Sequence, residues 1–291
     1  MQTQILRKIR QAVEQLNPNE VRQAAERPLV IRLAAESIPD YEMMEAFLSA
    51  RPVSRKKRME QASYIFRSDD EQMPKQSDLD IVMEGIEPPE GAFVFHPDRP
   101  TELVSEVLAA KQDLGLPLAR CFSPFRKPVT DRIINNVSRE NALFSLMTAA
   151  PNLFPGLQLP WAVPEAVSDA TVLTINQIRM AFMLAAASDR PVGYREQKAE
   201  VGALIAGALG WRTLARELAG KIPFGGGLIP KAGIAFAGTY VAGLSLERLY
   251  RVGYGLTRAE RRLAYGEAVE RGREVATALL EGWRARKARK V

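Results

Sequence analysis

The stretch that decides the fold of the first half of the chain is PLVIRLAAESIPDYEMMEAFL, residues 28–48. It opens with a largely apolar run, residues 28–35, that is typical of a short strand. Ser37, Pro39 and Asp40 then mark the start of a helix, because a serine side chain can accept a hydrogen bond from a free backbone amide and proline suits the first turn. A strand that leads directly into a helix favours a parallel sheet covered by helices.

The alternation of strands and helices continues to about residue 127. Further short apolar runs, bounded by Pro, Gly or Asp, predict strands at residues 78–85, 91–97 and 116–122. We therefore expect an N-terminal helix in residues 1–27 and an α/β domain in residues 28–127. Its small parallel or mixed sheet would be Rossmann-like or GTPase-like.

This predicted domain lacks the residues that hold a nucleotide. The first strand is not followed by a glycine-rich loop that ends in Lys-Ser or Lys-Thr. Glu36 and Asp40 would also repel a phosphate at the N-terminus of the next helix. No spacing of residues indicates a metal site. We therefore expect neither a cofactor nor a metal ion.

The carboxyl ends of the predicted strands are the place to look for a ligand site, because open parallel sheets bind ligands there. His96 and Asp98 are the weak candidates, as a general acid–base pair. The alternative is a turn in which the aspartate caps the next helix. The residues at these strand ends are Glu36, Ser37, Glu84, His96, Asp98, Arg99, Cys121 and Ser123.

Composition limits the compartment and the partners. The chain has 291 residues, of which 46% are hydrophobic and 25% charged, and its net charge is +6. This basic excess is too mild for a dedicated nucleic-acid binder. The single cysteine, Cys121, excludes an intramolecular disulfide, and the first residues carry no secretory signal. We expect a cytoplasmic protein without a nucleic-acid partner.

Residues 128–291 predict an all-α domain. Its last helix is expected at about residues 258–289, because Thr257 and Glu260 form a capping box at its start. A glycine-rich helical hairpin is expected at about residues 194–250. The residues assigned to this hairpin are Gly225, Gly226, Gly227, Pro230, Gly233, Ala237, Gly238, Thr239 and Gly243.

Small residues four apart in the second hairpin helix would let two backbones approach closely. The first helix offers Gly202, Ala206 and Gly210, so we expect these two helices to pack antiparallel. The apolar run 232–246 is shorter than the roughly 20 residues that span a bilayer. Its length favours burial in a helical bundle, with partial insertion or docking at a membrane surface as alternatives.

Four polar residues, Thr174, Asn176, Gln177 and Arg179, interrupt an otherwise apolar helix. One interpretation is a buried polar network that includes Thr239, Tyr240 or Glu247, since buried polar groups need partners. The other is the wet face of an amphipathic helix.

Basic residues cluster at two places. Residues 55–58 read RKKR and are expected in a loop, and a second cluster follows Trp283. Such clusters bind anionic lipid headgroups, although a solvated helix end is the alternative for the second. The candidate contacts to an anionic surface are Arg284, Arg286, Lys287, Arg289 and Lys290.

Residues 164–255 resemble a known family. The matching features, in order, are Thr174 to Gln177 with Met180, Leu218-Ala-Gly220, Ile222-Pro223, the glycines 225–227, Ile229-Pro230, and Ala237-Gly-Thr239 with Gly243. This order resembles a bacterial helical domain of unknown function, number six-nine-seven in its series, which is often found after Era-like and dynamin-like GTPase domains. The resemblance implies a helical module tied to membranes or to GTPase partners, and it implies no catalytic residue.

We therefore expect a non-catalytic interaction protein that associates with an anionic membrane surface or with a GTPase-type partner. A soluble helical scaffold without membrane contact is the first alternative. An enzyme or small-ligand binder around His96 and Asp98 is the second. The sequence is also compatible with a homo-oligomer.

Overall fold

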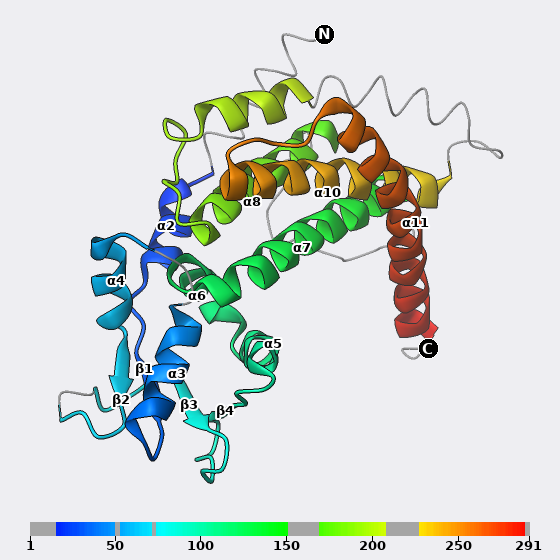
Figure 1. The fold of residues 1–291 in the computed structure, drawn as a ribbon. Coiled ribbons are helices and arrows are strands. Elements are labelled where there is room, and N and C mark those ends of the chain that lie inside the picture. Colours follow the sequence, from blue (N-terminus) through cyan, green and yellow to red (C-terminus); the bar gives the residue numbers. More distant parts are fainter. Residues whose placement is uncertain (1–15, 50–52, 72–73, 151–168, 208–226, 289–291) are drawn as a thin grey trace. The chain divides into compact units, whose positions relative to one another are not determined.

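The computed structural model describes residues 16–49, 53–71, 74–150, 169–207 and 227–288 (Figure 1). It confirms the predicted fold class, an α/β region followed by a helical region. The chain divides into two compact units. The α/β unit comprises Asn19–Asp131 with Ala186–Arg190, and the helical unit comprises Met1–Pro18, Arg132–Ala185 and Pro191–Val291.

The sheet of the α/β unit is fully parallel, with strand order β2-β1-β3-β4. The strands are β1 (Ile31–Ala34), β2 (Ile65–Arg67), β3 (Leu79–Met83) and β4 (Phe93–Phe95). Three of them were predicted. The short run at β2 was missed, although its Ile and Phe favour a strand.

One face of the sheet is apolar, because side chains alternate along each strand. Ile31 and Leu33 are completely buried on this face. Arg32 lies between them in β1 and forms two hydrogen bonds with Asp80 of β3, at 2.8 and 2.7 Å. This pair occupies positions of the pleat that point the other way. Val82 of β3 points to that side as well and is buried, so both sides of these strands carry buried side chains.

Helices of the α/β unit complete this core. Ser37 caps α3 as expected, by accepting a hydrogen bond from the Asp40 amide at 3.3 Å. The ring of Phe47 in α3 lies 5.4 Å from that of Phe95 in β4. The helices are α2 (Pro18–Glu26), α3 (Ile38–Leu48), α4 (Arg55–Ala62), α5 (Pro100–Ala110), the 3-10 turn η1 (Gln112–Leu114) and α6 (Gly115–Cys121).

Two predictions for this unit are wrong. Residues 116–122, predicted as a strand, lie mostly in helix α6, because a short apolar run cannot be assigned to a strand or a buried helix by its pattern alone. The RKKR cluster lies in helix α4 rather than in a loop. Ser54 starts this helix, since its hydroxyl accepts a hydrogen bond from the Lys57 amide at 3.2 Å.

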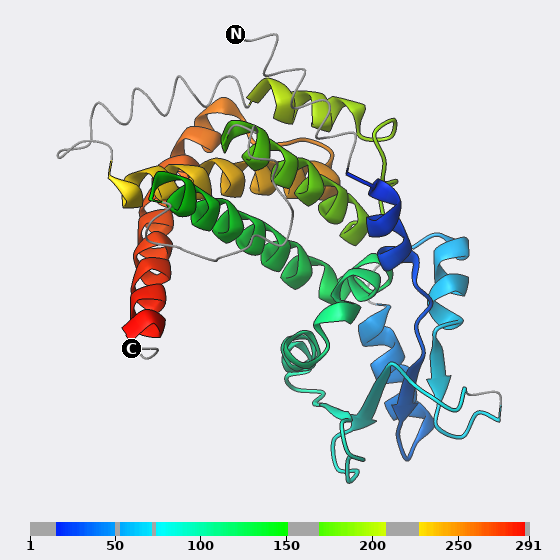
Figure 2. The same cartoon turned by 180° about the vertical axis from the view of Figure 1, so that it is seen from behind.

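In the helical unit, α7, α8 and α10 lie alongside one another in both views (Figures 1 and 2). The last helix, α11, begins with the expected capping box, in which Thr257 and Glu260 exchange hydrogen bonds at 2.8 and 3.3 Å. The helices here are α7 (Ser123–Ala149), whose residues up to Asp131 belong to the α/β unit, α8 (Asp169–Ala187), a helical segment at 198–207, α10 (Leu228–Val252) and α11 (Arg258–Ala288).

The close helix contact lies between α10 and α11. A Cβ built on Gly272 of α11 would stand 2.7 Å from the carbonyl oxygen of Gly233 in α10. The predicted contact at Gly202 is wrong, because Gly202 is exposed and a Cβ there would meet nothing within 4 Å. Ala206 is exposed too, and Gly210 lies outside the described residues. Glycine spacing indicates that a backbone approaches closely, but it does not identify the partner.

Among the described residues, one helical stretch is long and apolar enough to cross a membrane, Ala170–Ala187 of α8. In the fold, 72% of this stretch is buried. This is the pattern of a core helix, whose apolar side chains pack against other parts of the protein.

Candidate functional site

The polar residues of α8 form part of a buried network. Asn176 and Gln177 are only 2% and 6% exposed, so they are not the wet face of an amphipathic helix. Asn176 donates a hydrogen bond to the side-chain oxygen of Asn141 in α7, at 2.7 Å. The Asn141 amide in turn donates to the hydroxyl of Thr239 in α10, at 2.7 Å. Three helices are thus joined by one chain of hydrogen bonds.

Thr239 is the acceptor at the end of this series of hydrogen bonds. Gln177 also donates to its hydroxyl, at 3.3 Å, and the hydroxyl itself donates to the carbonyl of Ala235 at 3.0 Å. Thr174 donates within α8 to the carbonyl of Ala170. Asn141, which sequence reasoning missed, is completely buried. It directly follows the polar residues Ser138, Arg139 and Glu140 in α7, so its local sequence gave no signal of burial.

Other suggested members of the network have different partners. Arg179 pairs with Glu140 of α7, and burial raises the pKa of the Glu140 carboxyl while this guanidinium opposes the shift. Tyr240 accepts a hydrogen bond from Arg271 at 3.0 Å, and Glu247 accepts one from Arg251 at 2.8 Å.

Residues assigned to the glycine hairpin lie at or within α10 where the structure describes them. Gly227 is the N-cap of α10 and Pro230 lies in its first turn, while Gly225 and Gly226 fall outside the described residues. A Cβ on Gly243 would come within 2.8 Å of Ile134 and 3.1 Å of Met180. The buried members are Gly233, Ala237, Gly238, Thr239 and Gly243. Their small size serves packing, with Thr239 also in the polar network.

Residues at the basic C-terminus are described only in part. Arg284 is exposed on α11. Arg286 and Lys287 lie within the same helix, which ends at Ala288, whereas Arg289 and Lys290 lie outside the described residues.

Helix α4 carries a second basic surface, which we call the α4 face, formed by Arg55, Lys56, Arg58, Met59 and Ala62. All five residues are exposed, and Met59 is 65% exposed. Four of them, without Lys56, line an open hollow in the surface. Among the described residues, the three basic side chains form no ion pair.

The fourth basic residue of the cluster, Lys57, points inward. It is 8% exposed, and its ammonium group lies 3.1 Å from Glu60 and 3.0 Å from Asp189. Nearby Cys121 is buried, and this burial raises the pKa of its thiol to about 11, so the thiol stays protonated at neutral pH. A protonated, buried thiol is a poor nucleophile, which agrees with the interpretation of Cys121 as a core residue.

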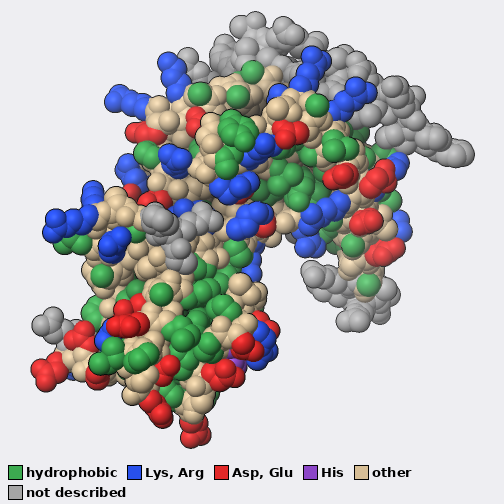
Figure 3. Space-filling model, viewed as in Figure 1, with side chains coloured by type: hydrophobic (Ala, Val, Ile, Leu, Met, Phe, Trp, Pro, Cys, Tyr) green, Lys and Arg blue, Asp and Glu red, His purple; other side chains and the backbone are tan. Residues whose placement is uncertain are grey.

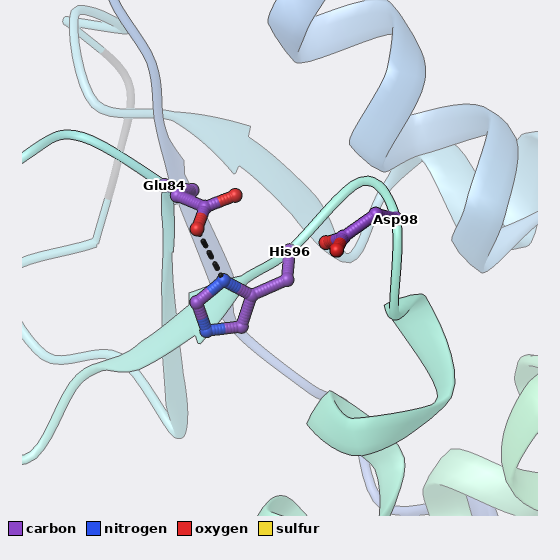
Figure 4. A group of neighbouring side chains, drawn as sticks. All are labelled: Glu84, His96 and Asp98. Atoms are coloured by element: carbon purple, nitrogen blue, oxygen red, sulfur yellow. Dashed lines mark ion pairs between the residues drawn. The ribbon is translucent and has the colours of Figure 1, made fainter.

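The carboxyl edge of the sheet brings the candidate ligand residues together (Figure 4). His96 directly follows β4, Asp98 lies in the turn before α5, and Glu84 directly follows β3. One ligand atom from each of these three residues lies within 4.8 Å of those from the other two. His96 Nδ1 lies 2.9 Å from Glu84 Oε1, although it is not aligned for a hydrogen bond with this oxygen.

At the same edge, the N-terminus of α3 occupies the place where a nucleotide phosphate binds in a nucleotide-binding sheet. Here Ser37 uses its hydroxyl to cap the helix, and Glu36 and Asp40 flank it. Phosphate is therefore disfavoured at this helix end.

No family model, curated protein or solved structure matches the chain.

Proposed function

We propose that this is a non-catalytic interaction protein that docks on an anionic membrane surface through the α4 face. The observation that supports this proposal is the group of three exposed basic side chains, Arg55, Lys56 and Arg58, which surround the exposed Met59. Basic groups can bind lipid phosphates while an apolar side chain enters the headgroup region.

Helix electrostatics gives the α4 face further support. Residues 55–58 place four positive charges in the first turn of α4, and this turn contains no acidic residue. The positive end of the helix dipole disfavours cations there. Only Lys57 has acidic partners among the described residues, so an external anion would relieve the repulsion felt by the other three.

The charges of the α/β unit would also orient the docked protein. Basic side chains gather around α4, whereas acidic side chains gather around the far ends of the strands (Figure 3). Exposed acidic residues at that end include Glu84, Glu87, Glu90 and Asp98. An anionic surface would attract the first end and repel the second.

The helical unit is proposed to bind a GTPase-type partner, as the resemblance of residues 164–255 implies. The basic end of α11 is a further candidate contact with the anionic membrane. These two roles are independent of the α4 face, and the role of α11 is tested separately.

The test is flotation of the full chain with vesicles of phosphatidylcholine containing phosphatidylserine, and with vesicles of phosphatidylcholine alone. We expect flotation only with the anionic vesicles and release at high salt. Each basic residue near such a surface contributes about 1 kcal/mol, so replacing Arg55, Lys56 and Arg58 by Gln should weaken binding roughly a hundredfold. A matched control replaces Lys75, Lys111 and Lys198 by Gln, which removes the same charge from scattered exposed positions.

The proposal fails if the wild-type protein stays at the bottom of the gradient, or if the α4 variant and the control float equally. Failure to float would leave an acidic protein as the alternative occupant of the α4 face. Removal of residues 284–291 tests the C-terminal cluster, since a loss of flotation only in this variant would assign membrane contact to α11 instead.

A further inference from the structure

The carboxyl edge of the sheet carries a second site that is independent of membrane docking. We propose that Glu84, His96 and Asp98 together bind one divalent transition-metal ion, of which Zn²⁺ is the representative. Four observations support this metal site: strand register, donor geometry, local charge and ligand chemistry.

Strand register brings two of the ligands together. β3 and β4 are parallel neighbours in which Met83 pairs with Phe95. Glu84 and His96 are the next residue of each strand, and the Glu84 amide donates a hydrogen bond to the Phe95 carbonyl at 3.1 Å. Two residues further on, the turn before α5 brings Asp98 to the same edge (Figure 4). Backbone hydrogen bonds therefore hold the cluster in place.

The donor atoms have a spacing that a small ion can bridge. Each residue offers one ligand atom, and these atoms lie within 4.8 Å of one another. Around a tetrahedral ion with bonds of about 2.1 Å, neighbouring donor atoms are about 3.4 Å apart. Glu84 and Asp98 have side chains that are 51% and 71% exposed. Small rotations of these mobile carboxylates would close the site.

His96 supplies the nitrogen donor of the site. Its side chain is 24% exposed, and Nδ1 is buried without a hydrogen-bond partner. A buried polar atom without a partner is unfavourable, and coordination of an ion by Nδ1 would satisfy it. This nitrogen faces Glu84, so both donors point toward the same small space (Figure 4).

Local charge favours a cation. The loop between β3 and β4, residues 84–92, contains Glu84, Glu87 and Glu90 and no basic residue. Arg99 is the competing cation, at 3.4 Å from Asp98. It also pairs with Glu102, at 3.0 Å. Arg99 would therefore keep a partner when Asp98 binds the ion.

Ligand chemistry defines the class of ion. Ca²⁺ and Mg²⁺ prefer oxygen ligands alone, whereas imidazole nitrogen suits Zn²⁺ and its first-row neighbours. Three protein ligands leave one position of a tetrahedral ion for water. The arrangement is that of an open site rather than of a closed structural one.

The test is titration of the full chain with zinc chloride by isothermal calorimetry. We expect one Zn²⁺ per chain, and at least a tenfold weaker affinity in Glu84→Gln, His96→Gln and Asp98→Asn. Glu90→Gln is the matched control, because it removes one carboxylate from the same loop outside the cluster, and its affinity should stay within about twofold of wild type. Co²⁺ provides a second measurement, since its visible absorption should change in His96→Gln if Nδ1 is a ligand.

The proposal is overturned if the wild-type chain binds no zinc, or if the three ligand variants bind as the control does. Glu84→Gln and Asp98→Asn alter exposed side chains, so they keep the test decisive even if His96→Gln fails to fold. The three variants should float with anionic vesicles as the wild type does, which separates a failure here from a failure of membrane docking.

Discussion

Single side chains in the helical unit combine burial with hydrogen bonding, and Thr239 is the clearest case. It is completely buried, accepts hydrogen bonds from Asn141 and Gln177, and comes from a different helix than either. Buried donors without acceptors are costly, so the network permits only arrangements of α7, α8 and α10 in which these groups meet. The small residues around Thr239 allow the helices to come that close.

Replacement of Thr239 by Val keeps the shape of the side chain but leaves the amides of Asn141 and Gln177 without this acceptor. We expect a loss of about 2 to 4 kcal/mol in the free energy of unfolding of the helical unit. Thr239→Ser keeps the hydroxyl and removes only a methyl group, which should cost about 1 kcal/mol. Urea unfolding followed by tryptophan fluorescence would measure both, because all three tryptophans lie after residue 131. Equal stability of the two variants would contradict this role of the hydroxyl.

Helices α10 and α11 pack antiparallel at glycine and alanine positions. Near one end, Ala232 and Phe236 of α10 contact Ala276 and Leu280 of α11. Farther along α10, Ala237 and Val241 reach positions 265 and 268 of α11 instead. Gly233 and Gly272 lie at the closest approach, where a backbone atom occupies the space that a side chain would need.

Gly272→Ala should therefore destabilise the protein, even though alanine favours a helix more than glycine does. The added Cβ would meet the Gly233 carbonyl oxygen at 2.7 Å, and the strain of such overpacking is about 1 to 3 kcal/mol. Gly266→Ala in the same helix is the control, since a Cβ there meets nothing within 4 Å. This control should gain up to about 1 kcal/mol from helix propensity. A gain in both variants, measured by urea unfolding, would show that α10 and α11 are not in close contact.

For the molecule as a whole, segments far apart in the sequence complete the α/β unit. Asp189 belongs to the segment 186–190, which contains the last two residues of α8 and the three residues after it. Although most of α8 belongs to the helical unit, this segment belongs to the α/β unit. The Asp189 carboxylate accepts hydrogen bonds from Lys57 at 3.0 Å and from Arg120 at 3.3 Å. Its backbone is left-handed, with φ of 55°, a conformation that Asp and Asn tolerate better than most residues do.

Asp189→Ala should loosen the α/β unit, because Lys57 is nearly buried and would lose one of its two acidic partners. We expect the free energy of unfolding to fall by about 1 to 2 kcal/mol. This loss is smaller than that for breaking an isolated buried ion pair, because Lys57 keeps Glu60 as a partner. Hydrogen exchange in α4 should then be roughly 5 to 30 times faster. Asp189→Asn, which keeps an acceptor oxygen, should have a smaller effect.

A surface ion pair provides the control for this experiment. Asp131 pairs with Lys127 one turn earlier in α7, and both side chains are about half exposed. Asp131→Ala should cost less than about 1 kcal/mol. Similar changes in the hydrogen exchange of α4 for Asp131→Ala and Asp189→Ala would mean that the ion pair between Asp189 and Lys57 does not specifically stabilise α4.

The sequence by itself determined the features that depend on neighbouring residues. The caps at Ser37 and Thr257, three of the four strands and the α/β-then-helical order follow from local hydrogen-bonding chemistry and from the spacing of apolar residues. The small-residue positions of α10 also indicated a close approach. Local patterns were less decisive for short apolar runs, so α6 was predicted as a strand and β2 was missed.

Only the tertiary structure decided which distant groups meet. Gly233 lies against α11 rather than against Gly202, Asn141 joins the polar residues of α8 to Thr239, and Glu84 joins His96. The physical reason is the same in each case. The chemistry of a side chain determines what kind of partner it needs, whereas the packing of helices and strands determines which residue becomes that partner.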